Sequence, residues 1–273
     1  MPKLDAVVLA GGRVSEALGP NVGVAYQAQI PINSQPMVQY VVQALRAVPE
    51  IDRIVVVGPQ ELNQVLSSDR CEVVELGETM VENLLRGLDT LQTTNKVLLA
   101  TGDIPLLTPE AVVDFLTQAR TIEKDIYYPI VSKEDNEASY PGVRRTYVRL
   151  KEGVFTGGNL ILVNPQCVYK CQNQIARAVA MRKKPWQLAR LLGFSFILKL
   201  LFNRLGLEEI EERVGGILGF QGKALISRWP EIGIDVDKSS DLQLARKIIE
   251  GNVTLKENVK SENAPGTIDT GQV

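Results

Sequence analysis

Short apolar runs recur along the first half of the chain and alternate with segments of helical periodicity. Val, Ile, Leu and Ala dominate residues 5–9, 53–57 and 96–100, and each run is followed by a turn and then by an amphipathic stretch. Continuous apolar runs of this length are typical of parallel strands that crossover helices bury on both faces. The pattern predicts an α/β fold with a three-layer, doubly wound and mostly parallel sheet.

The segments between these runs predict helices over residues 36–48, 59–66, 79–91 and 109–120. The last has clear start signals, because Thr108 can act as N-cap and Pro109 suits the first helical position. In a doubly wound sheet, ligands bind beyond the carboxyl ends of the strands. Gly11, Gly12 and Asp103 are placed at such ends, so we expect the ligand site there.

The second half of the chain is less regular. Its pattern predicts strands over 125–131, 159–163 and 223–227, a hairpin or edge strand over 140–153, and helices within 165–213. After an extended segment over 231–237, we expect a helix that starts with a capping box of Ser240 and Gln243. This half therefore predicts additions to the sheet and a helical insertion.

Residues 186–202 are apolar almost all round the helix that they predict. With Arg190 and Lys199 inside, the segment is short and charged for a membrane span. An apolar helix of this kind is more often covered by the core or by a second copy of the chain. A peripheral contact with a membrane surface is the alternative, whereas stable insertion is not expected.

Composition narrows the possible chemistry. The chain has 273 residues, 45% of them hydrophobic, and a formal net charge of −2, which gives no electrostatic reason to expect nucleic acid as the main partner. It contains no histidine, which excludes imidazole bases, Ser-His triads and His-ligated zinc. Catalysis must therefore depend on carboxylates, Lys or Arg, and a hard metal ion.

The cysteines and the amino terminus favour a cytoplasmic protein. Cys71, Cys167 and Cys171 are odd in number and form no paired CxxC units, so a disulfide framework or a zinc site is not expected. The first apolar run is too short for a signal peptide and leads directly into glycines.

Three aspartates are candidates for a metal site. The stretch "VLLATGDIPLL" brings Asp103 to the carboxyl end of a strand, and "GIDVDKSSDL" contains Asp235 and Asp237. We expect the latter two to face opposite sides of their extended segment, so that one of them reaches the edge where Asp103 lies. Two carboxylates together with substrate phosphates are a common way to hold Mg²⁺.

Four motifs occur in an order that resembles a known family. "VVLAGG", "TGDIPLL", "TGGNLILV" and "GIDVDKSSDLQLA" are similar to the motifs of MobA-like nucleotidyltransferases, a superfamily with a GT-A type fold, and the resemblance covers about residues 4–250. It implies that Asp103 and Asp235 bind Mg²⁺ or Mn²⁺, and that residues 156–159 line the acceptor side. It also implies nucleotide contacts from Leu9, Ala10, Gly11, Gly12, Arg13, Gln27, Asn83, Thr101 and Gly102.

The resemblance implies a single domain over residues 1–251. Its nucleotide-binding half would span about 1–122 and its acceptor half, with the helical insertion, about 165–220. Residues 252–273 are polar and rich in turn formers, which predicts a disordered tail.

The chain departs from the family where a lysine normally neutralises the triphosphate. Residues 14–45 contain neither Lys nor Arg, and the register of the resemblance implies that Gln27 stands in the position of that lysine. Arg13 is the nearest cation in sequence. Arg144, Arg145, residues 182–184 and Lys238 are candidates to supply the missing charge.

The implied reaction is Mg²⁺-dependent transfer of a nucleotidyl group from an NTP to a phosphorylated small molecule, with release of pyrophosphate. Arg13, Asp103 and Asp235 are the expected catalytic residues. Two rival functions remain open at this point. One is nucleotide binding with lost or weakened catalysis, and the other is glycosyl transfer from a nucleotide-sugar.

Overall fold

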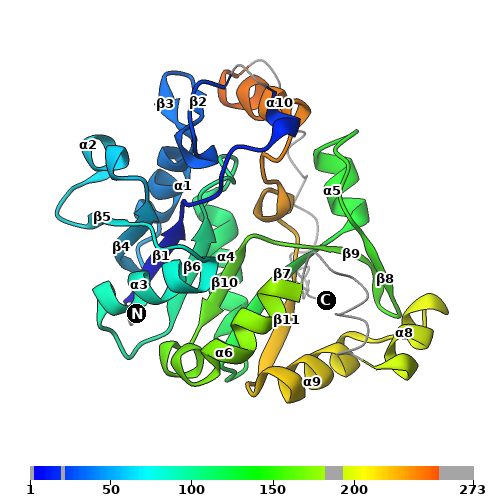
Figure 1. The fold of residues 1–273 in the computed structure, drawn as a ribbon. Helices are drawn as coiled ribbons and strands as arrows, with labels where there is room; N and C mark the ends of the chain where they lie inside the picture. Colours follow the sequence, from blue (N-terminus) through cyan, green and yellow to red (C-terminus); the bar gives the residue numbers. More distant parts are fainter. Residues whose placement is uncertain (1–2, 20–21, 182–192, 252–273) are drawn as a thin grey trace, which may run out of the picture.

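The structure, a computed structural model, describes residues 3–19, 22–181 and 193–251. A nine-stranded sheet runs in the order β5-β4-β1-β6-β10-β7-β9-β8, with β11 beside β7 (Figure 1). Its strands are β1 (Leu4–Leu9), β4 (Ile51–Gly58), β5 (Cys71–Glu75), β6 (Val97–Thr101), β7 (Ile126–Ser132), β8 (Val148–Leu150), β9 (Gly153–Gly157), β10 (Leu160–Val163) and β11 (Gly222–Ser227). A separate small hairpin consists of β2 (Pro31–Ile32) and β3 (Gln35–Pro36).

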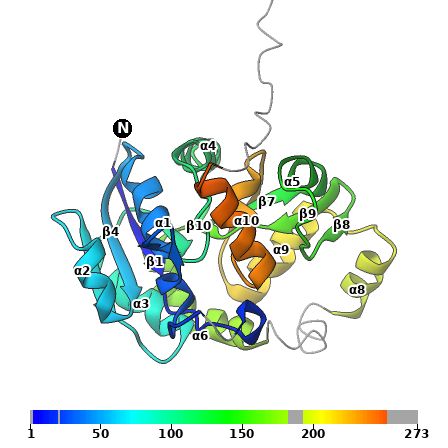
Figure 2. The same cartoon turned by 90° about the horizontal axis from the view of Figure 1, so that it is seen from above.

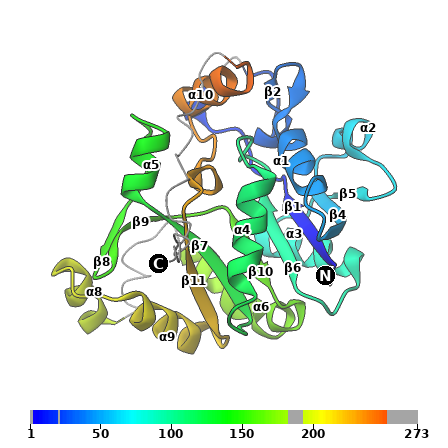
Figure 3. The ribbon, with the colours of Figure 1, turned by 180° about the vertical axis from the view of Figure 1, so that it is seen from behind.

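Helices cover both faces of the large sheet. The described α-helices are α1 (Met37–Arg46), α2 (Asn63–Leu66), α3 (Met80–Leu91), α4 (Pro109–Ala119), α5 (Lys133–Ser139), α6 (Pro165–Met181), α8 (Phe194–Leu201), α9 (Leu207–Leu218) and α10 (Ser239–Ile249). Helices α1 and α4 pack on one face and α3 and α6 on the other. Figure 1 shows the sheet from the side of α3 and α6, and Figure 3 from the side of α4. The predicted three-layer α/β architecture is confirmed.

The apolar runs of the first half form the parallel part of the sheet. β1 lies between β4 and β6 and pairs with both in parallel. Val7 and Val8, neighbours in β1, are both fully buried, which is why the run shows no polar alternation. β10 then joins β6 in the antiparallel direction, so the complete sheet is mixed.

The sequence pattern missed several elements, among them β5 and α5. β5 alternates buried and exposed residues at the edge of the sheet, so it lacks the continuous apolar run by which the other strands were recognised. Helix α5 is polar, and Ser132 caps it by accepting a hydrogen bond from the backbone N–H of Asp135 at 2.9 Å. In both cases the tertiary context stabilises a segment with a weak apolar signal.

Capping decides where the predicted helices begin. Thr108 caps α4 as expected, accepting from the N–H of Ala111 at 3.3 Å. The capping box at Ser240 is wrong, because α10 begins one residue earlier, with Lys238 at the N-cap and no side-chain cap hydrogen bond. Figure 2 looks down on α10, which lies above the edge where the carboxyl ends of the parallel strands meet.

The apolar segment 186–202 is only partly within the described residues, since 186–192 lie outside them. The remainder forms α8, preceded by Gly193 at a positive φ of 98°. Phe196 and Leu200 pack against a small core cluster, but Leu201 and Phe202 are 70% and 69% exposed. The expected packing against the second half is thus seen for Phe196 and Leu200, whereas cover by a second copy of the chain stays a prediction for the exposed Leu201 and Phe202.

None of the described helices is long and apolar enough to cross a membrane.

Candidate active site

A cavity of about 740 Å³ opens at the carboxyl ends of β1 and β6. It is lined by Leu9, Gly11, Gly12, Arg13, Tyr26, Gln27, Leu76, Gly77, Glu78, Thr79, Met80, Asn83, Thr101, Asp103, Asn159, Asp235 and Asp237. Most of the residues singled out from the sequence thus surround one space. Ala10 and Gly102 are exceptions: they do not line it, and Ala10 is 1% exposed.

The glycine loop after β1 packs closely against two neighbouring side chains. A Cβ on Gly11 would lie 2.5 Å from Cδ2 of Leu76, and one on Gly12 would lie 2.7 Å from Oε1 of Gln27. Glycine therefore lets the backbone run close to the wall of the cavity. A ligand in this cavity can approach the main chain of the loop directly.

Gln27 connects the glycine loop to the aspartate-containing loop. Its backbone N–H donates to the carbonyl of Gly12 at 2.8 Å, and its side-chain Nε2 donates to the carbonyl of Val236 at 3.4 Å. Its side chain is almost fully buried. Arg13 stacks on the ring of Tyr26 at 4.5 Å and is the only Lys or Arg among the described residues that line the cavity.

Three carboxylates meet at the floor of the cavity. Asp103, Asp235 and Asp237 each offer an oxygen, and these atoms lie within 4.8 Å of one another. The backbone holds the arrangement, because Val236 donates its N–H to the carbonyl of Asp103 at 2.9 Å. The predicted proximity of Asp103 to this segment is confirmed.

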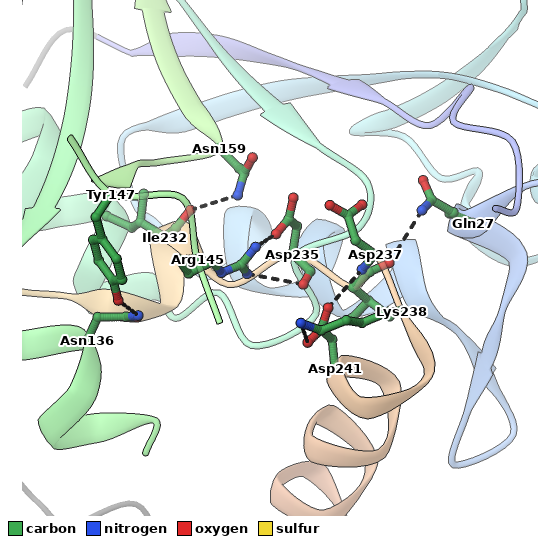
Figure 4. A network of polar contacts seen from close by, with 11 residues as sticks. Gln27, Asn136, Arg145, Tyr147, Asn159, Ile232, Asp235, Asp237, Lys238 and Asp241 are labelled. Atoms are coloured by element: carbon green, nitrogen blue, oxygen red, sulfur yellow. Dashed lines mark hydrogen bonds and ion pairs between the residues drawn. The ribbon is translucent and has the colours of Figure 1, made fainter. Parts of the chain in front are cut away.

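The expectation that Asp235 and Asp237 face opposite sides is wrong. Alternate residues of an extended chain share a side, and the residue between them, Val236, is fully buried in a core cluster. Both carboxylates are consequently directed to the cavity, as Figure 4 shows. Asp237 is a candidate ligand in addition to Asp235.

The donor set suits a hard divalent cation. Oδ1 of Asp103 is buried and has no hydrogen-bond partner among the described residues. Burial raises the pKa of Asp103 above its ordinary value, and the nearby charge of Asp237 acts in the same direction. A bound cation would offset both effects, and carboxylate oxygens are the ligands that Mg²⁺ prefers.

Arg145 lies behind the carboxylates and contacts Asp235. Its Nη1 forms an ion pair with Oδ1 of Asp235, and its Nη2 donates to the backbone carbonyl of the same residue at 3.1 Å. Further along the chain, Asp241 in the first turn of α10 accepts from the N–H of Asp237 at 3.3 Å, and Nζ of Lys238 lies 3.9 Å from Oδ1 of Asp241 (Figure 4). The sequence proposed Arg145 only as a source of charge for the triphosphate.

The opposite wall of the cavity is the start of α3. Thr79 caps this helix, and Oδ1 of Asn83 accepts a hydrogen bond from the N–H of Gly77 at 2.6 Å. The amide nitrogen of Asn83 lies on the side of Gly11, 3.1 Å from the position of a Cβ there. Asn83 therefore has a donor at the cavity, next to the glycine loop.

The segment 156–159 contributes one residue to the cavity. Asn159 lines it and is fixed by hydrogen bonds from its backbone N–H and its Nδ2 to the carbonyl of Ile232, at 2.9 and 3.3 Å. Thr156 lies in β9 and is 9% exposed. Tyr26 and Leu76 line the cavity and Asp241 contacts Asp237, but none of the three was singled out from the sequence. Only Asp241 could have been found there, because it is a further carboxylate four residues after Asp237.

Sequence comparison relates this chain to a described family. A profile of the MobA-like NTP transferase domain matches residues 6–189. No protein of curated function matches significantly.

Solved structures extend the similarity. A hypothetical transferase from Thermus thermophilus is 42% identical, with a TM-score of 0.79 over 88% of this chain and 99% of that one. CMP:2-keto-3-deoxy-manno-octonic acid synthetase complexed with CTP is 12% identical, with a TM-score of 0.58 over 93% and 100%. 4-Diphosphocytidyl-2C-methyl-D-erythritol synthase from Anaerococcus prevotii is also 12% identical, with a TM-score of 0.56 over 91% and 99%. The last two share the fold.

Proposed function

The chain belongs to the family of MobA-like NTP transferase domains, and from this premise we propose that it transfers a nucleotidyl group from an NTP to a phosphorylated small molecule. An oxygen of the acceptor phosphate forms a bond to the α-phosphorus. The bond between the α-phosphorus and the bridging oxygen breaks, and pyrophosphate leaves with the electron pair. An ionised acceptor phosphate needs no general base, which agrees with a chain that contains no histidine.

One observation carries this proposal: the glycine loop and three carboxylates border the same cavity. In such a reaction the protein acts through positioning and charge neutralisation. Asp103, Asp235 and Asp237 would hold a Mg²⁺ or Mn²⁺ ion. The ion, when bound, supplies positive charge to the phosphates.

The remaining residues would hold the two substrates. Gly11 and Gly12 let the nucleotide approach the main chain, and Arg13 offers a positive charge beside them. Asn83 would contact the base through its amide nitrogen. Asn159, which lines the cavity beside the segment 156–158, would contact the acceptor.

A second candidate function is nucleotide binding with weakened catalysis. Gln27 occupies the position of the family lysine, and its side-chain N–H is already used by the carbonyl of Val236. The described lining contains a single cation, Arg13. This candidate predicts NTP binding with little or no pyrophosphate release.

Thermal-shift measurements with ATP, GTP, CTP and UTP, each with and without Mg²⁺, test the nucleotide site. A ligand that binds only the native state raises the unfolding midpoint. CTP deserves inclusion because one structural neighbour is a complex with CTP. No shift with any NTP would contradict both candidate functions.

Asp103→Asn tests the carboxylates, because it keeps the side-chain volume and removes the charge. We expect it to abolish the Mg²⁺-dependent part of the shift and any pyrophosphate release. Asp52→Asn is the matched control, since Asp52 is half-exposed and pairs with Lys3 at the opposite end of the strands. Release of a nucleoside diphosphate from a nucleotide-sugar, in place of pyrophosphate from an NTP, would instead support glycosyl transfer.

The proposal includes a small-molecule phosphate as the acceptor. It also includes a homodimer, or a peripheral membrane contact, through residues 186–202. A cytoplasmic location is proposed with them.

A further inference from the structure

Arg145 makes a two-point contact with one metal-site residue. Its Nη1 pairs with Oδ1 of Asp235 and its Nη2 with the backbone carbonyl of Asp235. Both side chains are largely buried, at 11% and 20% exposed. A planar guanidinium that engages two groups of one residue fixes both the position and the rotation of that residue.

The loop that carries Arg145 is itself anchored. Asn136, fully buried in α5, donates from Nδ2 to the hydroxyl oxygen of Tyr147 at 2.6 Å. The backbone carbonyl of Asn136 accepts a hydrogen bond from the backbone N–H of Tyr140 at 2.8 Å. These bonds hold both ends of the segment around Arg145. The guanidinium therefore comes from a supported loop of the second half and reaches the carboxylates that follow β11.

The contact leaves the other oxygen of Asp235 free for a ligand. No hydrogen bond among the described residues involves Oδ2 of Asp235, and Figure 4 shows this oxygen turned away from Arg145. Asp235 lines the cavity together with Asp103, whose buried Oδ1 also has no partner in the described chain. Arg145 itself does not line the cavity.

We propose that Arg145 is a positioning residue for the metal site: it fixes Oδ1 and the main chain of Asp235, so that Oδ2 is left to bind the cation that Asp103, Asp235 and Asp237 would hold. This inference rests on the proposed function and deepens it by naming the group that orients one ligand. Carboxylates that bind metals are commonly held by such partners, whose loss costs about 10- to 100-fold in metal affinity or activity.

The charge of Arg145 has the opposite effect on a metal ion. A guanidinium beside carboxylates repels a divalent cation, so its removal by itself would strengthen metal binding. Loss of positioning therefore predicts weaker metal binding in an Arg145 variant, whereas loss of repulsion predicts tighter binding. A lysine at this position separates them, because it keeps the charge but cannot reproduce the planar two-point contact.

The test is a Mn²⁺ titration of the full-length protein without nucleotide, followed by calorimetry or by the EPR signal of free Mn²⁺. We expect Arg145→Lys and Arg145→Ala each to weaken Mn²⁺ binding by about 10- to 100-fold. Arg144→Ala is the matched control, because it removes the same charge from an exposed neighbouring side chain, and we expect about the wild-type affinity. Thermal unfolding of each variant checks that the fold is intact.

Arg145→Lys binding Mn²⁺ as tightly as the wild type, or more tightly, would overturn the positioning role and leave the metal site in place, because this variant keeps the charge and loses only the two-point contact. An equal loss in Arg144→Ala would also overturn it, because the loss would then not depend on the contact with Asp235. If the wild-type protein bound no Mn²⁺, or if Asp103→Asn bound it normally, the metal site of the proposed function would fail first and this inference with it.

Discussion

Gln27→Lys places a positive charge at the position that the resemblance aligns with the family's lysine. In this chain the Gln27 side chain is 8% exposed and donates a long hydrogen bond of 3.4 Å to the carbonyl of Val236. The substitution therefore gives up little hydrogen bonding. An ammonium group can donate to the same carbonyl and still have donors for a phosphate.

The expected gain follows from the strength of a charge-assisted contact. A hydrogen bond to a charged group contributes about 1.5–3 kcal/mol, which corresponds to about a 10- to 150-fold gain in affinity or rate. Two effects reduce it: the ammonium is partly desolvated in this buried position, and the carboxylates of Asp235 and Asp237 attract it. We therefore expect about a tenfold gain in NTP affinity.

NTP binding by calorimetry and pyrophosphate release, each at low and high salt, measure the effect. Gln27→Met is the matched control, since it has similar volume and length without charge. The gain should fall as salt rises, to the extent that solvent reaches the new charge.

Unchanged NTP binding in Gln27→Lys at low salt would refute the reasoning. Either the alignment of residue 27 with the family lysine is then wrong, or Arg13 already supplies the charge. Arg13→Ala decides between these explanations. A large loss would show that Arg13 holds the phosphates, and no effect from either variant would favour a chain that has kept the fold without the transferase chemistry.

Three further predictions concern stability, surface contact and pH. Thr108→Val removes the cap of α4 and should lower the free energy of unfolding by about 1–2 kcal/mol in urea denaturation. Phe202→Ser should leave stability nearly unchanged because the ring is exposed, and it should abolish any flotation of the protein with liposomes; flotation equal to the wild type would exclude a membrane role for Phe202. Hydrogen bonds from Lys151 and Lys199 lower the pKa of Glu209 from 4.5 to about 2. Because this folded-state pKa is depressed, the stabilisation should be present above about pH 4.5 and be lost as the pH falls toward 2, and Lys151→Met should raise the pKa of Glu209 in an NMR titration.

The sequence predicted the first half of the fold well because strands that are buried on both faces there appear as continuous apolar runs. β1 has water on neither face, so the run of residues 5–9 is almost purely apolar. Where one face is solvated, as in β5, or where an element is mainly polar, as in α5, this pattern weakens. Helix starts have sequence signals of their own, and the N-cap residue Thr108 of α4 is the clearest of them.

The site was predictable to the extent that its residues are close in sequence to strand ends. Gly11, Gly12 and Asp103 follow β1 and β6 directly, so the parallel topology alone brings them together. Arg145 has no such trace. It lies 90 residues before Asp235 in the sequence, and only the packing of the second half against the loop after β11 brings the two side chains together.

Val236 explains why the metal site and the glycine loop form one unit. Its N–H is bonded to the carbonyl of Asp103, its carbonyl accepts from Gln27, and its side chain is buried in the core. The carboxylates on either side of it are thus placed by the backbone of a residue that cannot rotate freely. The glutamine at position 27 takes part in this arrangement, so its presence preserves the geometry of the carboxylates even though it contributes no charge. Retention of the geometry without the charge would fit a transferase whose compensating cation comes from elsewhere, and we propose Arg13, the one cation of the described lining, as that cation.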